Sequence, residues 1–220
     1  MIFYVPGIHG GVSGQAVVDN AEELWIVGGG NGTAFRNIFV LRYSNGSFAL
    51  DDELEVSFAR FGHCGATIDN KIVIVGGQND GIVEMVEVID MDMRTVEWSE
   101  EWSPPHRRWG SLCLPYNDKK MLVMGGMDNF FLPHNTVDIL DLTSMTWSPG
   151  PRLPWSQSGG SGSVTSGGPT LFSGYSLQGY QRHVTSLSPE GWVTWDKRLD
   201  SARVSGAAIT VPSDIMDVCL

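Results

Sequence analysis

Apolar strands that end in glycine recur about every 49 residues along this chain, and this repeat restricts the possible folds more than any other feature. The strands precede Gly28, Gly76, Gly125 and, more weakly, Gly174, and in the first three copies a second glycine follows. Gly28 and Gly76 are 48 positions apart, and Gly76 and Gly125 are 49 apart. A fixed period of about 20–50 residues is typical of solenoids, propellers and other arrays.

A second series of residues has the same period. Trp98, Trp147 and Trp195 are separated by 49 and 48 positions, and Phe48 lies 50 positions before Trp98. An alternating strand lies between each glycine and its aromatic residue. We interpret the aromatic series as packing between repeats rather than as a set of ligand-stacking platforms, because it keeps the phase of the repeat.

Each repeat is predicted to contain four strands, and the second repeat shows them most clearly. We expect its strands over residues 62–68, 71–75, 83–90 and 95–98. The connections are short and rich in turn residues, which is typical of an antiparallel meander. No helical period of apolar residues is evident.

The first strand of each repeat is built from small residues, whereas the last strands carry large aromatic ones. Examples of the small residues are Gly65–Ala66, Gly110–Ser111 and the glycine- and serine-rich run 159–163. When sheets are arranged radially, the inner strands converge on an axis and the outer strands diverge. The small-to-large gradient therefore predicts an all-β propeller of four four-stranded antiparallel blades.

At this level the chain resembles the kelch-repeat family. The resemblance rests on the glycine pairs, on the tryptophan series and on arginines that open the blades at Arg60, Arg108 and Arg203; Asp90 and Asp141 also stand where the family often has aspartate. It implies a single kelch-like propeller domain over residues 1–220. The implied repeats are approximately 7–58, 59–106, 107–154 and 155–201.

A further first-strand pattern over residues 203–211 is predicted to form one extra C-terminal strand. Propellers of the kelch family typically have six or seven blades, and this chain has four. The chain is therefore expected either to be a fragment of a longer propeller or to close in an unusual way. An incomplete ring would expose apolar faces of its terminal blades and favour self-association.

Composition excludes several classes of partner. The formal net charge is −11, which disfavours binding to nucleic acid or to an anionic membrane. No apolar run approaches the ~20 residues that a membrane helix needs, so no membrane insertion is predicted, and no signal peptide is evident at the N-terminus.

The cysteines and two sequons bear on the cellular compartment. Cys64, Cys113 and Cys219 are odd in number and widely spaced, so we expect three reduced thiols rather than a disulfide framework or a zinc site. Asn31 and Asn45 begin Asn-X-Ser/Thr sequons, but both are also Asn-Gly pairs that tight turns favour. A cytoplasmic location is favoured, and an extracellular one stays open.

No catalytic constellation stands out, so the chain is predicted not to be an enzyme and to need no cofactor and no metal. The glycine run after the first apolar strand is not followed by a helix that could bind a pyrophosphate. His9 and His63 lie in first strands and could face a central channel, although a structural role in the repeat is favoured. A galactose-oxidase-like or sugar-isomerising kelch enzyme is the less favoured alternative.

The favoured function is recognition of a protein partner through the propeller loops, because loops cluster at one end of a propeller. A glycan-binding or adhesion propeller outside the cell is the alternative. The acidic segment 51–53 is interpreted as solvated protection of a sheet edge. The candidate partner-binding residues are Arg36, Asn79, Asp80, Asp128, Asn129, Phe130, Phe131, Tyr180 and Arg182.

Overall fold

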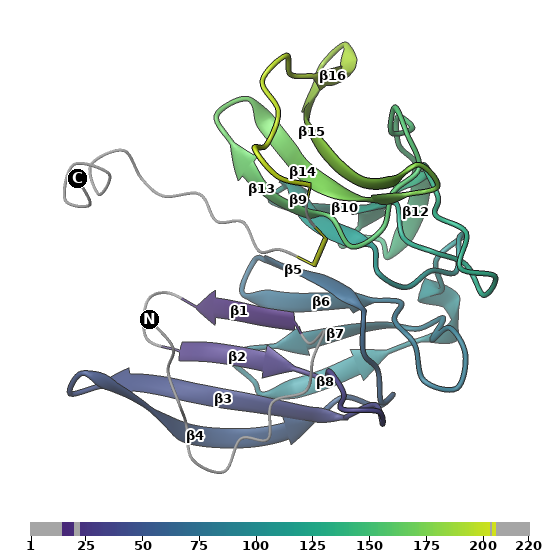
Figure 1. The fold of residues 1–220 in the computed structure, drawn as a ribbon. Coiled ribbons are helices and arrows are strands. Elements are labelled where there is room, and N and C mark those ends of the chain that lie inside the picture. The colour runs from purple at the N-terminus through teal and green to yellow at the C-terminus, as the bar shows by residue number, and fades with distance from the viewer. Residues whose placement is uncertain (1–14, 20–22, 203, 206–220) are drawn as a thin grey trace.

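A computed structural model of the chain describes residues 15–19, 23–202 and 204–205, and the side chains from residue 23 onward. It contains four separate four-stranded antiparallel sheets, which confirms the predicted fold class. Each sheet is a simple meander of four consecutive strands (Figure 1). We call the sheets blades 1 to 4 in chain order.

Blade 1 consists of β1 (Gln15–Asp19), β2 (Glu23–Val27), β3 (Asn37–Ser44) and β4 (Ser47–Glu55). Blade 2 consists of β5 (Cys64–Ile68), β6 (Lys71–Val75), β7 (Val86–Asp90) and β8 (Thr95–Trp98), and a short 3-10 helix, Glu100–Trp102, follows it. Blade 3 consists of β9 (Leu112–Asn117), β10 (Lys120–Met124), β11 (Val137–Asp141) and β12 (Thr146–Pro149). Blade 4 consists of β13 (Ser161–Thr165), β14 (Gly168–Ser176), β15 (Gly179–Ser188) and β16 (Gly191–Thr194).

The strands predicted for the second repeat agree closely with blade 2. The predicted second and fourth strands have the bounds of β6 and β8, whereas β5 begins two residues later and β7 three residues later than predicted. The predicted extra strand over 203–211 lies outside the described residues, apart from Val204 and Ser205.

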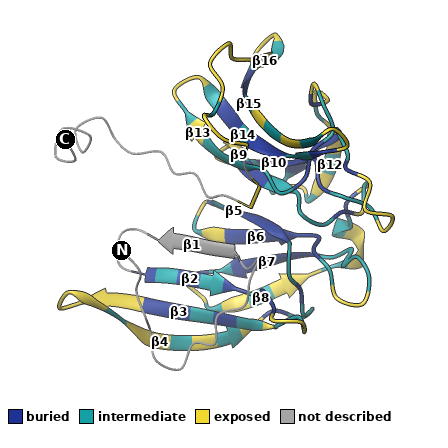
Figure 2. Ribbon diagram, in the orientation of Figure 1, coloured by how far each residue is buried: buried dark blue, intermediate teal, exposed yellow. Residues whose placement is uncertain are grey.

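Apolar clusters join each blade to the next. In β6, Ile72 and Ile74 pack with residues of blade 1, while Val73 and Val75 pack with residues of blade 3. A third cluster, which includes Leu122 of β10, joins blades 3 and 4. Since alternate residues of a strand point to opposite faces, a middle blade buries both faces. Figure 2 accordingly shows β6 and β10 mostly dark blue, and the outer strand β4 largely yellow.

The paired glycines are required where one blade approaches the next. A Cβ atom on Gly76 would lie 2.3 Å from the carbonyl oxygen of Arg108, and one on Gly125 would lie 2.4 Å from that of Gln157. Both glycines also have left-handed backbone angles, with φ of 68° and 62°. The next glycine, Gly77, donates its N–H to the Arg108 carbonyl (3.2 Å). The sequence repeat therefore marks the contact points between successive blades.

Two buried arginines hold the loops of blades 2 and 3. Arg108 is fully buried and donates to the carbonyls of Gly125 (2.8 Å) and Thr136 (3.1 Å), and it forms an ion pair with Asp138. Arg60 has the equivalent role in blade 2, where its ion-pair partner is Glu87. These contacts support the structural interpretation of the repeated arginines; Arg203 lies outside the described residues.

Blade 4 lacks this ion pair. Gln157 takes the position of Arg108, since its carbonyl accepts the N–H of Gly126 (2.8 Å) just as the Arg108 carbonyl accepts that of Gly77. By strand register, Thr185 takes the position of Asp138. Both charges have been replaced together, which avoids an unpaired buried charge.

A row of backbone hydrogen bonds connects the blade-opening segments. Gly110 donates its N–H to the oxygen of Gly62 (2.7 Å), Gly159 to that of Gly110 (2.8 Å), and Ser205 to that of Gly159 (2.7 Å). All four residues have φ between 54° and 63°. Ser205 therefore occupies the position at which a fifth unit begins, in agreement with the sequence pattern that starts at 203.

The expectation of three reduced thiols is wrong for two of them. Cys64 of β5 and Cys113 of β9 form a disulfide, with their Cα atoms 5.3 Å apart. Their separation of 49 residues is close to the repeat period, so both lie at the start of the inner strands of neighbouring blades. They are offset by one position, since Cys64 pairs with Val75 and Cys113 with Val123, and alternate residues of a strand point to opposite faces. The near-equality of this separation and the repeat period was visible in the sequence. Cys219 lies outside the described residues.

The tryptophan series is less regular in space than in sequence. Trp98 pairs with Glu87, whereas Trp147 pairs with Leu140. By register, Trp147 corresponds instead to Trp192, which pairs with Leu187 in blade 4. The segment between the glycine pair and the third strand is two residues longer in blade 3 than in blade 2, and this shifts Trp147 relative to Trp98. Trp192, rather than Trp195, packs against the cluster between blades 3 and 4.

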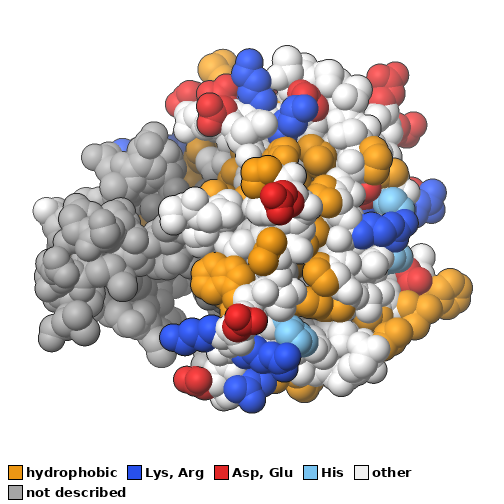
Figure 3. All heavy atoms as spheres, turned by 90° about the horizontal axis from the view of Figure 1, so that it is seen from above, with side chains coloured by type: hydrophobic (Ala, Val, Ile, Leu, Met, Phe, Trp, Pro, Cys, Tyr) orange, Lys and Arg blue, Asp and Glu red, His pale blue; other side chains and the backbone are white. Residues whose placement is uncertain are grey.

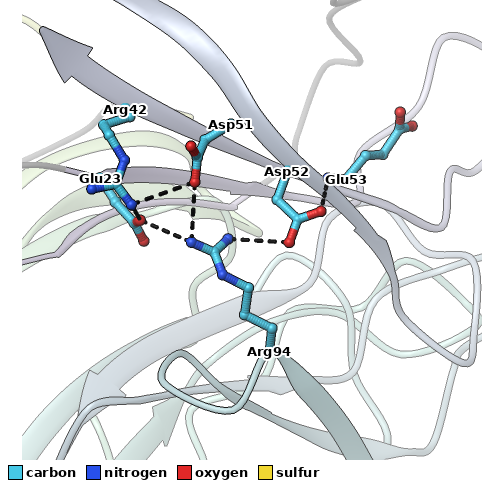
Figure 4. Close-up of polar contacts among 6 residues, drawn as sticks. All are labelled: Glu23, Arg42, Asp51, Asp52, Glu53 and Arg94. Atoms are coloured by element: carbon cyan, nitrogen blue, oxygen red, sulfur yellow. Dashed lines mark hydrogen bonds and ion pairs between the residues drawn. The ribbon is translucent and has the colours of Figure 1, made fainter.

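A network of charged side chains joins blades 1 and 2 (Figure 4). Arg94, in the turn between β7 and β8, contacts Glu23 (2.9 Å), Asp51 (3.2 Å) and Asp52 (3.4 Å) of blade 1. Its guanidinium also lies 5.4 Å from the ring centre of the buried Trp25. The acidic segment that we interpreted as solvated edge protection therefore forms ion pairs with the neighbouring blade.

Candidate protein-binding face

One end of the blades carries both the connections between blades and the loops that join the second and third strands of each blade (Figure 1). Isolated bridges tie these two kinds of segment together. Phe61 pairs with Gln78 in blade 2, Trp109 with Met127 in blade 3, and Ser158 with Tyr175 in blade 4. We call this end the loop face. Every predicted partner-binding residue lies in a segment or strand end that contributes to it.

An open depression lies between blades 1 and 2 on the loop face, with a volume of about 660 Å³. Arg36 lines it, held by a hydrogen bond from its Nε to the Val56 carbonyl (2.9 Å) and by an ion pair with Glu55 (3.3 Å). Asn79 and Glu84 of the β6–β7 loop also line it. Arg36 and Asn79 are thus brought together, whereas Asp80 is exposed and does not line the depression.

The β10–β11 loop presents three exposed apolar residues in succession. Phe130, Phe131 and Leu132 are 81%, 62% and 50% exposed. Asp128 orders this loop, because its Oδ1 accepts the backbone N–H groups of Phe130 (2.8 Å) and Leu132 (3.0 Å). The ring of Phe131 makes an edge-to-face contact with Trp109, with 5.7 Å between ring centres. We call residues 130–132 the apolar tip; Asn129 beside it is exposed.

The predicted residues of blade 4 lie apart from the depression between blades 1 and 2. Tyr180 is 64% exposed and rests against Tyr175, with 5.8 Å between ring centres. Arg182 is exposed and donates from its Nε to the carbonyl of Leu199 (2.6 Å). Figure 3, which views the molecule from the side of blade 4, shows hydrophobic side chains gathered across the middle of this blade's outward face.

Three further residues of the loop face were not among the partner-binding candidates predicted from the sequence. Leu132 extends the apolar tip, and Trp109 contacts the ring of Phe131 within it. Glu84 forms an ion pair with Arg107 (2.5 Å) at the depression. Their positions on the loop face follow from the loop geometry, because these residues lie in irregular segments outside the repeat pattern.

His63 is buried between blades 1 and 2 rather than exposed to a channel. A Cβ atom on Gly28 would lie 3.0 Å from its ring. Burial, and after it the charge of Arg60, lower the pKa of His63 to about 3, against an opposing hydrogen-bond contribution from Val27. His9 lies outside the described residues. Within the described part of the chain, no three His, Cys, Asp or Glu side chains form a group that could hold a metal ion.

The low pKa of His63 predicts a loss of stability in mild acid. The unfolded chain takes up a proton on this histidine near pH 6.5, whereas the native protein does not until about pH 3. The stabilisation is therefore complete above pH 6.5 and decreases as the pH falls, by up to about 1.4 kcal/mol per pH unit. Urea unfolding at pH 7.5 and at pH 5.5 gives the free energy of unfolding at each pH. The difference between the two values should be smaller for His63→Gln than for the wild type. Equal differences would contradict this interpretation.

The four radial sheets with their interblade clusters define a β-propeller. Residues 59–104, which contain all four strands of blade 2, match the model of the Kelch motif family. The solved structure entitled "Structure of YjhT" is similar, with a TM-score of 0.75 over 90% of this chain and 73% of that chain at 14% sequence identity. At this identity the likeness shows the fold alone. Together these findings show that the chain has a kelch-type propeller fold and contains a Kelch motif in blade 2.

A curated relative matches over a shorter stretch. It is the acyl-CoA-binding domain-containing protein 4 of Arabidopsis thaliana, 31% identical over 101 residues, which cover 41% of this chain. The chain spans only 15% of the length of that protein. Separately, no helix in the described residues is long and apolar enough to cross a bilayer.

Proposed function

We propose that this propeller is a protein-binding module, not an enzyme, and that its partner contacts the loop face. The apolar tip would anchor the partner, since aromatic residues dominate the energetics of many protein interfaces. Asn129 and Asp128 flank the tip, and Tyr180 and Arg182 supply a second patch on blade 4. Arg36, Asn79 and Asp80 supply polar groups at the other side of the loop face.

The backbone of Phe131 is the observation that carries this proposal. Phe131 has a φ of 60°, in the left-handed region that favours glycine and asparagine. For a bulky residue this conformation costs about 1–2 kcal/mol. The chain nevertheless has phenylalanine here, with 62% of it exposed to solvent. Strain combined with an exposed aromatic ring is typical of a functional site.

Replacing the tip should separate binding from folding. We expect Phe130→Ala with Phe131→Asn to leave the midpoint of thermal unfolding within a few degrees of the wild type, because relief of backbone strain offsets the lost contact with Trp109. Binding to a partner should weaken by about 30-fold or more, since a central aromatic anchor contributes at least about 2 kcal/mol. Quantitative affinity capture from the native source, followed by titration of the recovered partner, measures both effects.

Met93→Ala is the matched control, because Met93 is 72% exposed on the β7–β8 turn, at the opposite end of the blades. The control should bind the partner as the wild type does. Equal retention of every captured protein by the tip variant and the control would exclude the apolar tip as the anchor. Unfolding of the tip variant would show instead that the two rings belong to the core.

A further inference from the structure

The β3–β4 hairpin of blade 1 presents a sequon in an open turn. Asn45 and Gly46 form the two central positions of the turn, with φ of 50° and 83°. Asn45, Gly46 and Ser47 are all exposed, and a Cβ atom on Gly46 would meet nothing within 4 Å. The hairpin lies at the end of the blades opposite to the loop face (Figure 1). The acceptor side chain is therefore accessible without disturbing the proposed partner site.

An aromatic pair lies directly beside this turn. Tyr43 and Phe48 are cross-strand partners whose ring centres are 5.1 Å apart. Tyr43 is 47% exposed and lies near the end of β3, two residues before Asn45 and directly beside the turn. An exposed aromatic ring in this position offers an apolar surface for a group attached to Asn45.

The disulfide is an independent observation that favours the same modification. Cys64 and Cys113 are joined across blades 2 and 3 and are both buried. Disulfides form and persist in oxidising compartments such as the endoplasmic reticulum and are rare in the cytosol. Asn-X-Ser/Thr sequons on exposed loops of secreted proteins are the acceptors of N-linked glycans. The disulfide and the exposed sequon therefore both favour an oxidising compartment such as the endoplasmic reticulum.

We propose that Asn45 carries an N-linked glycan and that its first sugar packs against Tyr43. The donor is an oligosaccharide joined through pyrophosphate to a lipid. A bond forms between the Asn45 side-chain nitrogen and C1 of the first sugar, and the bond between C1 and the pyrophosphate oxygen breaks. The lipid pyrophosphate leaves with the bonding electrons, and the amide loses one proton to a base of the transferase.

The second sequon provides an internal comparison. Asn31 is also exposed, but it lies in the compact β2–β3 loop, where its own N–H donates to the Thr33 carbonyl (3.3 Å). Gly29, two positions before Asn31, has no side-chain ring against which a sugar could pack. A glycan on Asn31 would thus lack the packing surface that Tyr43 gives to one on Asn45.

Mass spectrometry of the protein from its native source tests the modification. Peptides that contain Asn45 are expected to carry a glycan that a peptide-N-glycosidase removes, with conversion of Asn45 to aspartate. Cys64 and Cys113 should resist alkylation until a reductant is added. Unmodified Asn45 in the native protein, or alkylation of both cysteines without reductant, would overturn the proposal.

Variants of the full chain secreted from eukaryotic cells test the packing. Asn45→Gln and Ser47→Ala should lose the Asn45 glycopeptide, and Asn31→Gln should keep it. Enzymatic removal of the glycan should lower the thermal midpoint of the wild type by about 2–4 °C. In Tyr43→Ser the glycan should remain, but its removal should leave the midpoint unchanged. An equal shift in both proteins would show that Tyr43 does not contact the sugar.

Discussion

Arg108→Ala should lower the free energy of unfolding by about 3–5 kcal/mol, which is the usual cost of removing one partner of a buried ion pair. The variant leaves the carboxylate of Asp138, which is 2% exposed, without its guanidinium partner. It also removes the hydrogen bonds to the carbonyls of Gly125 and Thr136, which hold the β10–β11 connection. Urea denaturation followed by tryptophan fluorescence measures the effect.

Arg107→Ala is the matched control, since the neighbouring arginine forms an ion pair with Glu84 in which its own side chain is 64% exposed. An exposed pair of this kind contributes about 0–1 kcal/mol. The two adjacent arginines should therefore differ severalfold in their effect. Similar losses from the two substitutions would show that Arg108 does not hold the blade in the manner described.

Removing the disulfide is the second change with a large expected effect. Cys64 and Cys113 close a loop of 49 residues, for which the chain-entropy model gives a stabilisation of about 4 kcal/mol. Cys64→Ala with Cys113→Ala should lower the free energy of unfolding by about that amount, and reduction of the wild type should have a similar effect. Denaturant unfolding with and without reductant makes the comparison.

The reduced wild type is the control for packing, because it retains both sulfur atoms at the interface between blades 2 and 3. The double variant should show no further loss when a reductant is added. A wild-type protein whose stability is insensitive to a reductant that demonstrably frees both thiols would contradict the expected contribution of the bond.

The repeat made the blades predictable, since its glycines and arginines correspond to physical constraints. Gly76 and Gly125 mark the points where a carbonyl of the next blade approaches too closely for a side chain. Arg60 and Arg108 mark buried ion pairs whose acidic partners were not identified from the sequence. Glu87 and Asp138 follow their arginines by 27 and 30 residues, so the varying loop between them obscures the relationship.

The errors in prediction have similarly specific causes. The cysteines were assessed by their number and local motifs, although their spacing is close to the period that places them on adjacent inner strands. Trp98 and Trp147 have the spacing of the repeat but different strand partners, because an insertion of two residues precedes the third strand of blade 3. The predicted repeat boundaries and self-association stay predictions.

The candidate site was predictable only as a set of loops. The exposure of Phe130 and Phe131 follows from the way Asp128 ties the loop back on itself, and this contact depends on loop geometry rather than on a periodic pattern. The depression beside Arg36 likewise requires the packing of two blades. The meander topology predicted from the sequence places these loops at one end of the blades. The shapes of the loops could be seen only in the structure.

Photo-crosslinking from position 130 tests most directly whether the loop face binds a partner. A photoreactive residue at position 130 should yield a crosslinked partner in extracts of the native source, and unlabelled wild-type protein should compete it away. The same residue at position 93, on the opposite end of the blades, should yield no such product. Crosslinking of the same partner from position 93 but not from position 130 would contradict the account.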